Sequence, residues 1–417
     1  MEKLKYYIFI LLVFVLQSCE SREPAKLMEP DTGFMLGDDL LISSNLELVK
    51  GKRIAVVVNK ASVLSDGTSL LDTLLRIDSV KIGVVFTPEH GYYINAPAGT
   101  TVQDSSLNTI PFYSLYGRNK KPDPEMLDSV DLILFDLQDI GTRFYTYIST
   151  LFYVMQAAGE NNIPVIVLDR PDPIGGINVA GPVLNQDFRS FVGIASIPVI
   201  YGMTAGELAQ LFSGEGLFSA KPELKVIRMK NWKRDSFFND YKRVWINTSP
   251  NIPDFETALI YPSTAFLEGT NISEGRGTDK PFKQIGAPFI NSENLINELN
   301  KFQHEGISLK PVSFTPTDLQ GKAENPKYEN ITCNGILLNV TNHKEFRPMG
   351  FSIRLLYVLH KLYPGKFKFE PSVFDRLMGG DDTREMLSMN KTPDKIIDSW
   401  KPGIEKFLQI RTIYLLY

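Results

Sequence analysis

Four short apolar runs, separated by longer mixed segments, constrain the fold of this chain most strongly. They span residues 53–59, 80–86, 131–136 and 163–168. Their β-branched, nearly charge-free composition is typical of strands buried on both faces of a parallel sheet. Residues 69–77, between the first two runs, have leucines at helical spacing, and parallel strands need such a crossover. The sequence therefore predicts an α/β fold with a Rossmann-like, doubly wound and mostly parallel sheet.

The second part of the chain has a different pattern. A chain of 417 residues exceeds what one core usually organises, so we expect two domains. The first part has further strand signals at residues 224–229 and 244–247. Beyond Leu259 we expect strands at 307–314 and 336–340, and helices at 293–302, at 351–362 and near the C-terminus. We predict a Rossmann-like catalytic domain over residues 46–258 and a smaller α+β domain over 259–417.

The N-terminus resembles a bacterial lipoprotein signal. Two lysines precede an apolar run over residues 6–16, which has the length of a signal-peptide core. Leu16-Gln17-Ser18-Cys19 then resembles a lipoprotein cleavage box, and an ordinary signal peptide is the alternative. We expect residues 1–18 to be removed, Cys19 to be lipidated and residues 19–45 to form a tether and lead-in segment. The protein would then be anchored to a membrane of the bacterial cell envelope through its lipid alone.

Charge and cysteine content narrow the possible partners. The formal net charge is −4, so no basic excess indicates a nucleic-acid partner. The chain has two cysteines. With Cys19 acylated, no intramolecular disulfide can form, and Cys333 lies in an apolar run that predicts burial.

Polar clusters follow the four predicted strands. They contain Asn59, Glu89-His90, the segment from Asp136 to Arg143, and Asp169-Arg170. Because parallel strands end at one edge of a sheet, these side chains would line one cleft suited to acid-base work on a polar or anionic substrate. Each cluster alone also fits a helix cap or a loop ion pair. For Asp169-Arg170 that structural role is at least as well supported.

Several kinds of chemistry lack their motifs in this sequence. Neither G-x-G-x-x-G after the first strands, nor G-x-x-x-x-G-K-[ST], nor G-x-S-x-G occurs, and the four histidines show no metal-ligand spacing. We therefore expect no cofactor and no metal, while a metal-dependent hydrolase stays as an alternative that chelators would inactivate. Carboxylate chemistry remains. Glu89 stands in a turn that Pro88 and Gly91 impose, and its partner is open among Asp136, Asp139, Glu268 and Glu274.

Longer motifs carry a family resemblance. They are FTPEHG, DLQDIGTRFYTY, VLDRPDPIGG, GPVL, SPNIPDFETALIYPSTAFLEGTNISEGRGT and the ending RTIYLLY. Together they resemble the NamZ-type exo-β-N-acetylmuramidases, from about Leu46 to Tyr417. The resemblance implies a cleft between two domains and the release of terminal N-acetylmuramic acid from the non-reducing ends of peptidoglycan fragments. It also implies that Glu89 is the catalytic acid, and we group His90 and Asp139 with it as catalytic candidates.

The expected substrate gives a reason for the arginines in the predicted cleft. N-acetylmuramic acid carries a lactyl carboxylate, which a planar guanidinium can bind bidentately, and Arg143 and Arg276 are the candidates. Tyrosines near the cleft could stack on the sugar. The predicted substrate-binding set is Asn59, Arg143, Tyr145, Arg170, Glu268, Glu274 and Arg276. A non-catalytic lipoprotein that binds cell-wall sugars would need the same cleft, and activity on a muramic acid glycoside separates the two.

Overall fold

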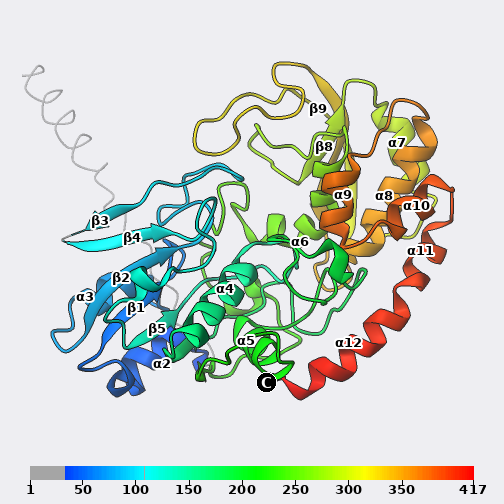
Figure 1. Cartoon of the computed structure of the whole chain (residues 1–417). Helices are drawn as coiled ribbons and strands as arrows, with labels where there is room; N and C mark the ends of the chain where they lie inside the picture. The colour runs from blue at the N-terminus through cyan, green and yellow to red at the C-terminus, as the bar shows by residue number, and fades with distance from the viewer. Residues whose placement is uncertain (1–32, 108) are drawn as a thin grey trace, which may run out of the picture.

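Two sheets organise the computed structural model, which describes residues 33–107 and 109–417. The predicted signal peptide, Cys19 and most of the tether lie outside the described residues. The larger sheet has the order β3-β4-β2-β1-β5-β6-β7 (Figure 1). Its strands are β1 (Arg53–Val57), β2 (Lys81–Thr87), β3 (Ser105–Leu107), β4 (Ile110–Ser114), β5 (Leu132–Phe135), β6 (Val165–Leu168) and β7 (Leu224–Ile227). The smaller sheet is antiparallel, with β8 (Gln284–Ala287), β10 (Cys333–Val340) and β9 (Ile307–Phe314) in that order.

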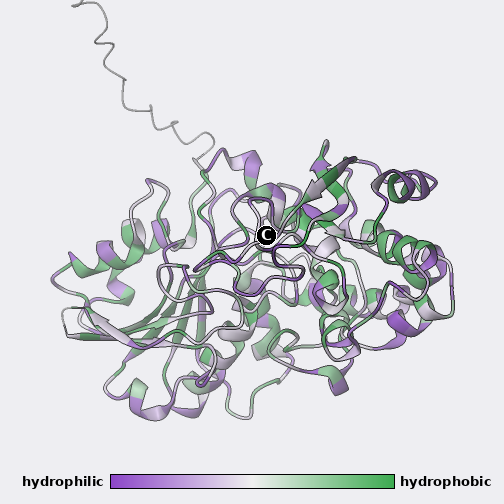
Figure 2. Cartoon of the chain, turned by 90° about the horizontal axis from the view of Figure 1, so that it is seen from above, coloured by the Kyte–Doolittle hydropathy of each residue, from purple (hydrophilic) through white to green (hydrophobic). Residues whose placement is uncertain are grey.

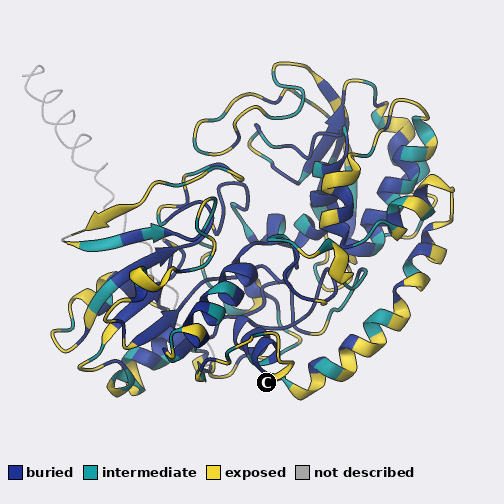
Figure 3. Cartoon of the chain, in the orientation of Figure 1, coloured by how far each residue is buried: buried dark blue, intermediate teal, exposed yellow. Residues whose placement is uncertain are grey.

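Helices cover both faces of the large sheet. The helices α2 (Gly37–Ser44) and α3 (Leu70–Leu75) pack on one face, and α4 (Tyr147–Glu160) and α5 (Ala205–Gly214) on the other. Alternate residues of β1 belong to separate cores: Ile54 and Val56 pack with α2 and α3, whereas Ala55 and Val57 pack with α4. Successive side chains of a strand point to opposite faces, so this strand must be apolar throughout. The central strands β1, β5 and β6 are accordingly buried along most of their length, whereas the edge strand β3 is exposed (Figure 3).

The strand order is that of a doubly wound sheet. From β1 the chain proceeds through β2 to β4 on one side, returns to β5 beside β1, and continues to β6 and β7. All these neighbours pair in parallel, and only β3 is antiparallel. The predicted fold class is therefore confirmed. Two details differ. Residues 91–121 are rich in Gly, Pro, Tyr and Thr and predict a long functional loop, but they contain the β3–β4 hairpin. The strand predicted at residues 244–247 was wrong because that segment is irregular.

The C-terminal part places helices against the small sheet. They are α6 (Phe255–Thr264), α7 (Ser292–Leu299), α8 (Pro348–Leu362), α9 (Pro371–Met378), α10 (Asp382–Ser388), α11 (Pro393–Ser399) and α12 (Lys401–Ile413). The predicted boundary at Leu259 falls within α6 and stays a prediction. Helix α12 leads the chain back to the N-terminal part (Figure 1), where Arg411 donates to the carbonyl of Gly202 and the Tyr417 hydroxyl donates to Asp169.

Hydropathy follows this layering. Viewed from above, the strands of the large sheet are mostly hydrophobic, whereas surface helices carry both kinds of residue (Figure 2). Within residues 33–107 and 109–417, no helix combines the length and the apolar character that crossing a membrane requires.

Candidate active site

Glu89 lies in a tight turn at the carboxyl end of β2. His90 and Gly91 both have positive φ, 74° and 70°, and together they reverse the chain. A left-handed histidine is uncommon, and the turn requires it here. The turn leaves Glu89 only 7% exposed at the edge of the sheet where parallel folds bind their ligands.

Two groups from separate segments donate hydrogen bonds to the Glu89 carboxylate. The Gly99 amide donates to Oε1 at 2.9 Å, and the Thr146 hydroxyl donates to Oε2 at 2.7 Å. Tyr116 lines the same cavity as Glu89, and burial followed by the Glu89 charge raises the pKa of Tyr116. Tyr116 follows β4 and Thr146 precedes α4, so segments far apart in the sequence surround this acid.

His90 is held as a neutral imidazole. Its Nδ1 lies 2.7 Å from the carbonyl oxygen of Ala96, which can only accept, so Nδ1 carries the proton. Burial lowers the pKa of His90, and the nearby Glu89 opposes this only in part. His90 therefore shapes the turn as a neutral donor.

A cavity of about 260 Å³ opens beside Glu89. Its walls come from both parts of the chain and are rich in aromatic side chains. Its lining residues include Glu89, His90, Gly99, Tyr116, Phe144, Tyr145, Thr146, Tyr261, Glu268, Arg276, Phe282 and Leu377. Aromatic walls with a few polar groups are typical of sites that bind sugar rings.

A second cavity of about 450 Å³ adjoins the first. At the junction the Arg276 guanidinium pairs with Glu268 (NH2 to Oε1, 3.0 Å), lies 3.6 Å from Glu274, and is 5.0 Å above the ring of Phe282. Lys327 pairs with Glu274 at 3.2 Å from the other side. Burial raises the pKa of Glu268, although Arg276 opposes the shift.

The structure brings several predicted site residues together. Glu89, His90, Tyr145, Glu268 and Arg276 line the first cavity, and Glu274 lines the second.

Arg143 does not reach either cavity. It is 0% exposed, and its NH1 donates to the carbonyls of Pro182 and Ile197 at 2.7 and 2.9 Å. Its NH2 donates to those of Leu377 and Met378 at 3.0 and 2.7 Å. The last two end helix α9, whose final carbonyls have no partner within the helix. The structure corrects its predicted role: the guanidinium caps α9 and joins the two parts of the chain.

Other predicted residues are also structural. Arg170 is 4% exposed and binds Asp136 and Asp38 at 2.8 and 2.6 Å, which occupies both carboxylates. Asn59 donates to the Tyr147 hydroxyl at 2.9 Å and lines neither cavity. These positions correct the predicted substrate-binding roles of Arg170 and Asn59.

Asp139 does not line the cavity beside Glu89. It accepts from the Gly141 amide at 2.8 Å and from the Tyr201 hydroxyl, in a buried polar cluster. Burial raises its pKa to about 6. The catalytic role of Asp139 stays a prediction.

Sequence reasoning missed the residues that hold Glu89 in place. Thr146 lies in the motif DLQDIGTRFYTY but carries no charge, and Gly99 lies in the stretch of residues 91–121, which predicts a loop. Lys327 lies in the connection between β9 and β10, and no motif or spacing in the sequence predicts its pairing with Glu274. The length of the connection after β2 was the one available hint, since long connections are often functional.

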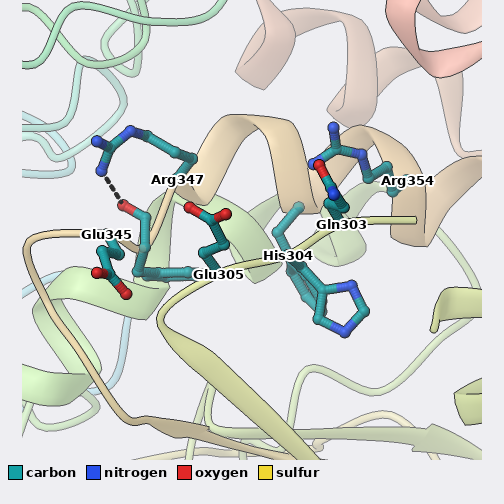
Figure 4. Close-up of a pocket in the computed structure, with 8 residues that line it drawn as sticks. Gln303, His304, Glu305, Glu345, Arg347 and Arg354 are labelled. Atoms are coloured by element: carbon teal, nitrogen blue, oxygen red, sulfur yellow. Dashed lines mark hydrogen bonds between the residues drawn. The ribbon is translucent and has the colours of Figure 1, made fainter. Parts of the chain in front are cut away.

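Other features lie apart from this site. Cys333 is buried as predicted, and burial raises its pKa to about 11. In the described part of the chain, no three His, Cys, Asp or Glu side chains are grouped as metal ligands would be. Figure 4 shows a separate hollow of about 210 Å³ with Arg347 near Glu305 and Glu345, and with Arg354 near Gln303. It shares no lining residue with the cavities at Glu89.

Comparison with known proteins agrees with this geometry. The family models "Exo-beta-N-acetylmuramidase NamZ, N-terminal" and "C-terminal" match residues 54–256 and 259–417. The chain is 42% identical over 384 residues to the peptidoglycan beta-N-acetylmuramidase NamZ of Bacillus subtilis (strain 168), which covers 91% of each protein.

Solved structures show the same fold. Crystal structures of two DUF1343 family proteins from Bacteroides fragilis NCTC 9343 are both 31% identical to this chain. They superpose with TM-scores of 0.84 and 0.75, covering 93% and 92% of this chain and 100% and 99% of theirs. The chain therefore belongs to the NamZ family of exo-β-N-acetylmuramidases and is a glycosidase.

Proposed function

We propose that this protein releases terminal N-acetylmuramic acid from the non-reducing ends of peptidoglycan fragments, with Glu89 as the general acid. One observation carries the proposal: a nearly buried carboxyl group is fixed by two donors at the wall of an aromatic cavity. A non-catalytic sugar-binding protein would need the aromatic cavity but not an acid fixed in this way. The B. subtilis relative carries the corresponding activity in its name.

The geometry accounts for the chemistry of the acid. Glu89 donates its proton to the glycosidic oxygen as the bond from that oxygen to the anomeric carbon breaks, and water supplies the hydroxyl group that ends on this carbon. The carboxylate left on Glu89 accepts hydrogen bonds from the Gly99 amide and the Thr146 hydroxyl. A hydroxyl group can donate or accept, so Thr146 suits both protonation states.

Glu268 is our candidate for the second catalytic group. Of the four carboxylates that the sequence left open, Asp136 is paired with Arg170, and Asp139 lies elsewhere. Among the described residues, Glu268 is the only other acidic side chain that lines the cavity of Glu89. Both carboxylates also raise the pKa of Tyr116 after burial, so they act on the same hydroxyl.

Arg276 is the remaining candidate for the lactyl carboxylate. Its guanidinium lies at the wall of the cavity with 18% of its side chain exposed, and its NH2 has one carboxylate partner at 3.0 Å. A desolvated anion needs a paired cation, and Arg276 is the cation that lines the cavity among the described residues.

Anchoring is a proposal from the sequence alone. We propose that Cys19 is the acylated N-terminus and that the enzyme acts in the cell envelope from a lipid anchor. The mass of the native N-terminal peptide tests this, and a mature chain that starts elsewhere without lipid would rule it out.

Replacement of Glu89 by Gln tests the central assignment. The change keeps the shape of the side chain but removes the transferable proton, so we expect turnover to fall by roughly 10²–10⁴-fold. Glycosides with good leaving groups need less protonation and should lose less. Glu305→Gln, in the separate hollow of Figure 4, is the matched control and should keep full turnover. Normal rates of Glu89→Gln on poor and good leaving groups alike would assign the chemistry to another residue.

A further inference from the structure

We propose that the second cavity is the subsite for the leaving sugar and that residues 322–327 form its outer wall. The proposal rests on the function proposed above and adds the place where the other product is held. The cavity measures about 450 Å³ and is lined by residues 97–100, by Glu268, Glu274 and Arg276, and by residues 322–327.

The two cavities meet at the acid. Both are lined by Ala98, Gly99, Glu268 and Arg276. The Gly99 amide donates to Glu89 at 2.9 Å, so the proton donor lies where one cavity passes into the other. A general acid must be within hydrogen-bond reach of the oxygen that it protonates. The scissile oxygen therefore lies at this junction, with one sugar on each side of it.

The aromatic character of the smaller cavity assigns the two sugars. Its rings suit stacking on the terminal sugar, and Arg276, which borders both cavities, can reach the carboxylate of that sugar from the junction. The larger cavity is bordered by chain segments instead of rings, and it leads away from Glu89 toward the exposed residues Lys322, Glu324 and Asn325. It therefore receives the part of the substrate that continues beyond the cleaved bond.

The outer wall is anchored on both parts of the chain. Asn251 donates to the carbonyl of Lys322 at 2.8 Å, and a Cβ on Gly321 would lie 2.7 Å from the carbonyl of Asn95. At its other end Lys327 donates to the carbonyl of Leu267 at 2.6 Å. Figure 1 shows this connection between β9 and β10 reaching across toward the N-terminal part. The wall is therefore fixed before any substrate arrives.

Three polar side chains of the wall have no partner among the described residues. Those of Lys322, Glu324 and Asn325 make no hydrogen bond or ion pair with the residues that the structure describes. An ammonium, a carboxylate and an amide supply donors and acceptors of both kinds. Their charges balance, which suits the hydroxyl and acetamido groups of a neutral amino sugar such as N-acetylglucosamine.

Two substrates separate this subsite from the catalytic one. An aryl glycoside of N-acetylmuramic acid places only a flat ring beyond the scissile bond, whereas the disaccharide with N-acetylglucosamine fills the second cavity. For the variant Lys322→Ala/Glu324→Ala, we expect kcat/KM on the disaccharide, relative to that on the aryl glycoside, to fall by about 10–100-fold, the effect of losing one or two hydrogen bonds. Lys310→Ala, on β9 outside both cavities, is the control and should leave the ratio unchanged.

The outcomes separate the two proposals. An unchanged ratio, or equal losses on both substrates in a variant that keeps the wild-type melting temperature, would overturn the subsite. Wild-type protein inactive on both substrates would refute the proposed function and the subsite together. Wild-type activity with a selective loss on the disaccharide supports both.

Discussion

Replacement of Arg143 by Met tests whether this buried arginine holds the fold or binds substrate. The guanidinium donates to four carbonyls at 2.7–3.0 Å. Met keeps an unbranched apolar stem but leaves all four carbonyls without this partner. At about 1 kcal/mol for each net hydrogen bond, the loss sums to about 4 kcal/mol. Burial of the guanidinium lowers its pKa to about 9, so removing this buried charge offsets part of the loss.

The assay is urea unfolding together with kinetics on the folded variant. We expect Arg143→Met to lower the unfolding midpoint while KM for an N-acetylmuramic acid glycoside stays close to wild type. Arg276→Met is the comparison variant, and for it we expect the reverse result, a small loss of stability with a raised KM. Its partly exposed ion pair should cost on the order of 1 kcal/mol of stability. Its KM should rise by roughly 10–100-fold for the acid sugar, as expected for a lost charge-assisted contact. A raised KM with unchanged stability in Arg143→Met would refute the reasoning.

Two further predictions concern buried polar groups. Thr146→Val removes the 2.7 Å donor to Glu89, so kcat should fall by roughly 10-fold with KM held, and Thr146→Ser should restore it. If KM and kcat moved together in Thr146→Val, the hydroxyl would not act through the acid. Burial raises the pKa of Asp139 from 3.8 to about 6, so stability from this group is present below pH 4 and is lost as pH rises through 6. Asp139→Asn should therefore gain up to about 3 kcal/mol over wild type at pH 8 but none near pH 4, measured by urea unfolding; a difference independent of pH would contradict this.

The sequence predicted the strands best where every residue is buried. The segments at β1, β2, β5 and β6 are apolar on both faces, so their patterns left little choice, and the residues after them were correctly expected at one edge. Strand β4 was missed because Pro111 interrupts it, and proline lowers the strand signal. The strand predicted at residues 244–247 was wrong for the opposite reason. The composition of this segment favours a strand, but no neighbouring strand in the described structure pairs with it.

The arginines show why the site was harder to predict than the sheet. Arg143 and Arg170 follow strands, and the sequence places both in the predicted substrate-binding set with Arg276, although for Arg170 it supports a structural role at least as well. The partners that make them structural are far away in the sequence: Met378 is 235 residues from Arg143, and Asp38 is 132 residues from Arg170. Local pattern gives the residue type and its place at the sheet edge. Only the packing of remote segments decides whether a guanidinium is consumed by carbonyls and carboxylates or left facing the cavity.

Phe282 extends this argument to the wall of the cavity. Its φ is +62°, a conformation that costs a bulky residue about 1–3 kcal/mol. Two bonds hold it there: its amide donates to the carbonyl of Glu274 at 2.7 Å, and its carbonyl accepts from the Thr264 hydroxyl at 3.0 Å. The ring then lies 5.0 Å below the Arg276 guanidinium. A side chain in an ordinary conformation would point elsewhere, so the strained conformation keeps the ring against the Arg276 guanidinium at the wall of the described cavity. Such a requirement leaves no periodic trace in the sequence.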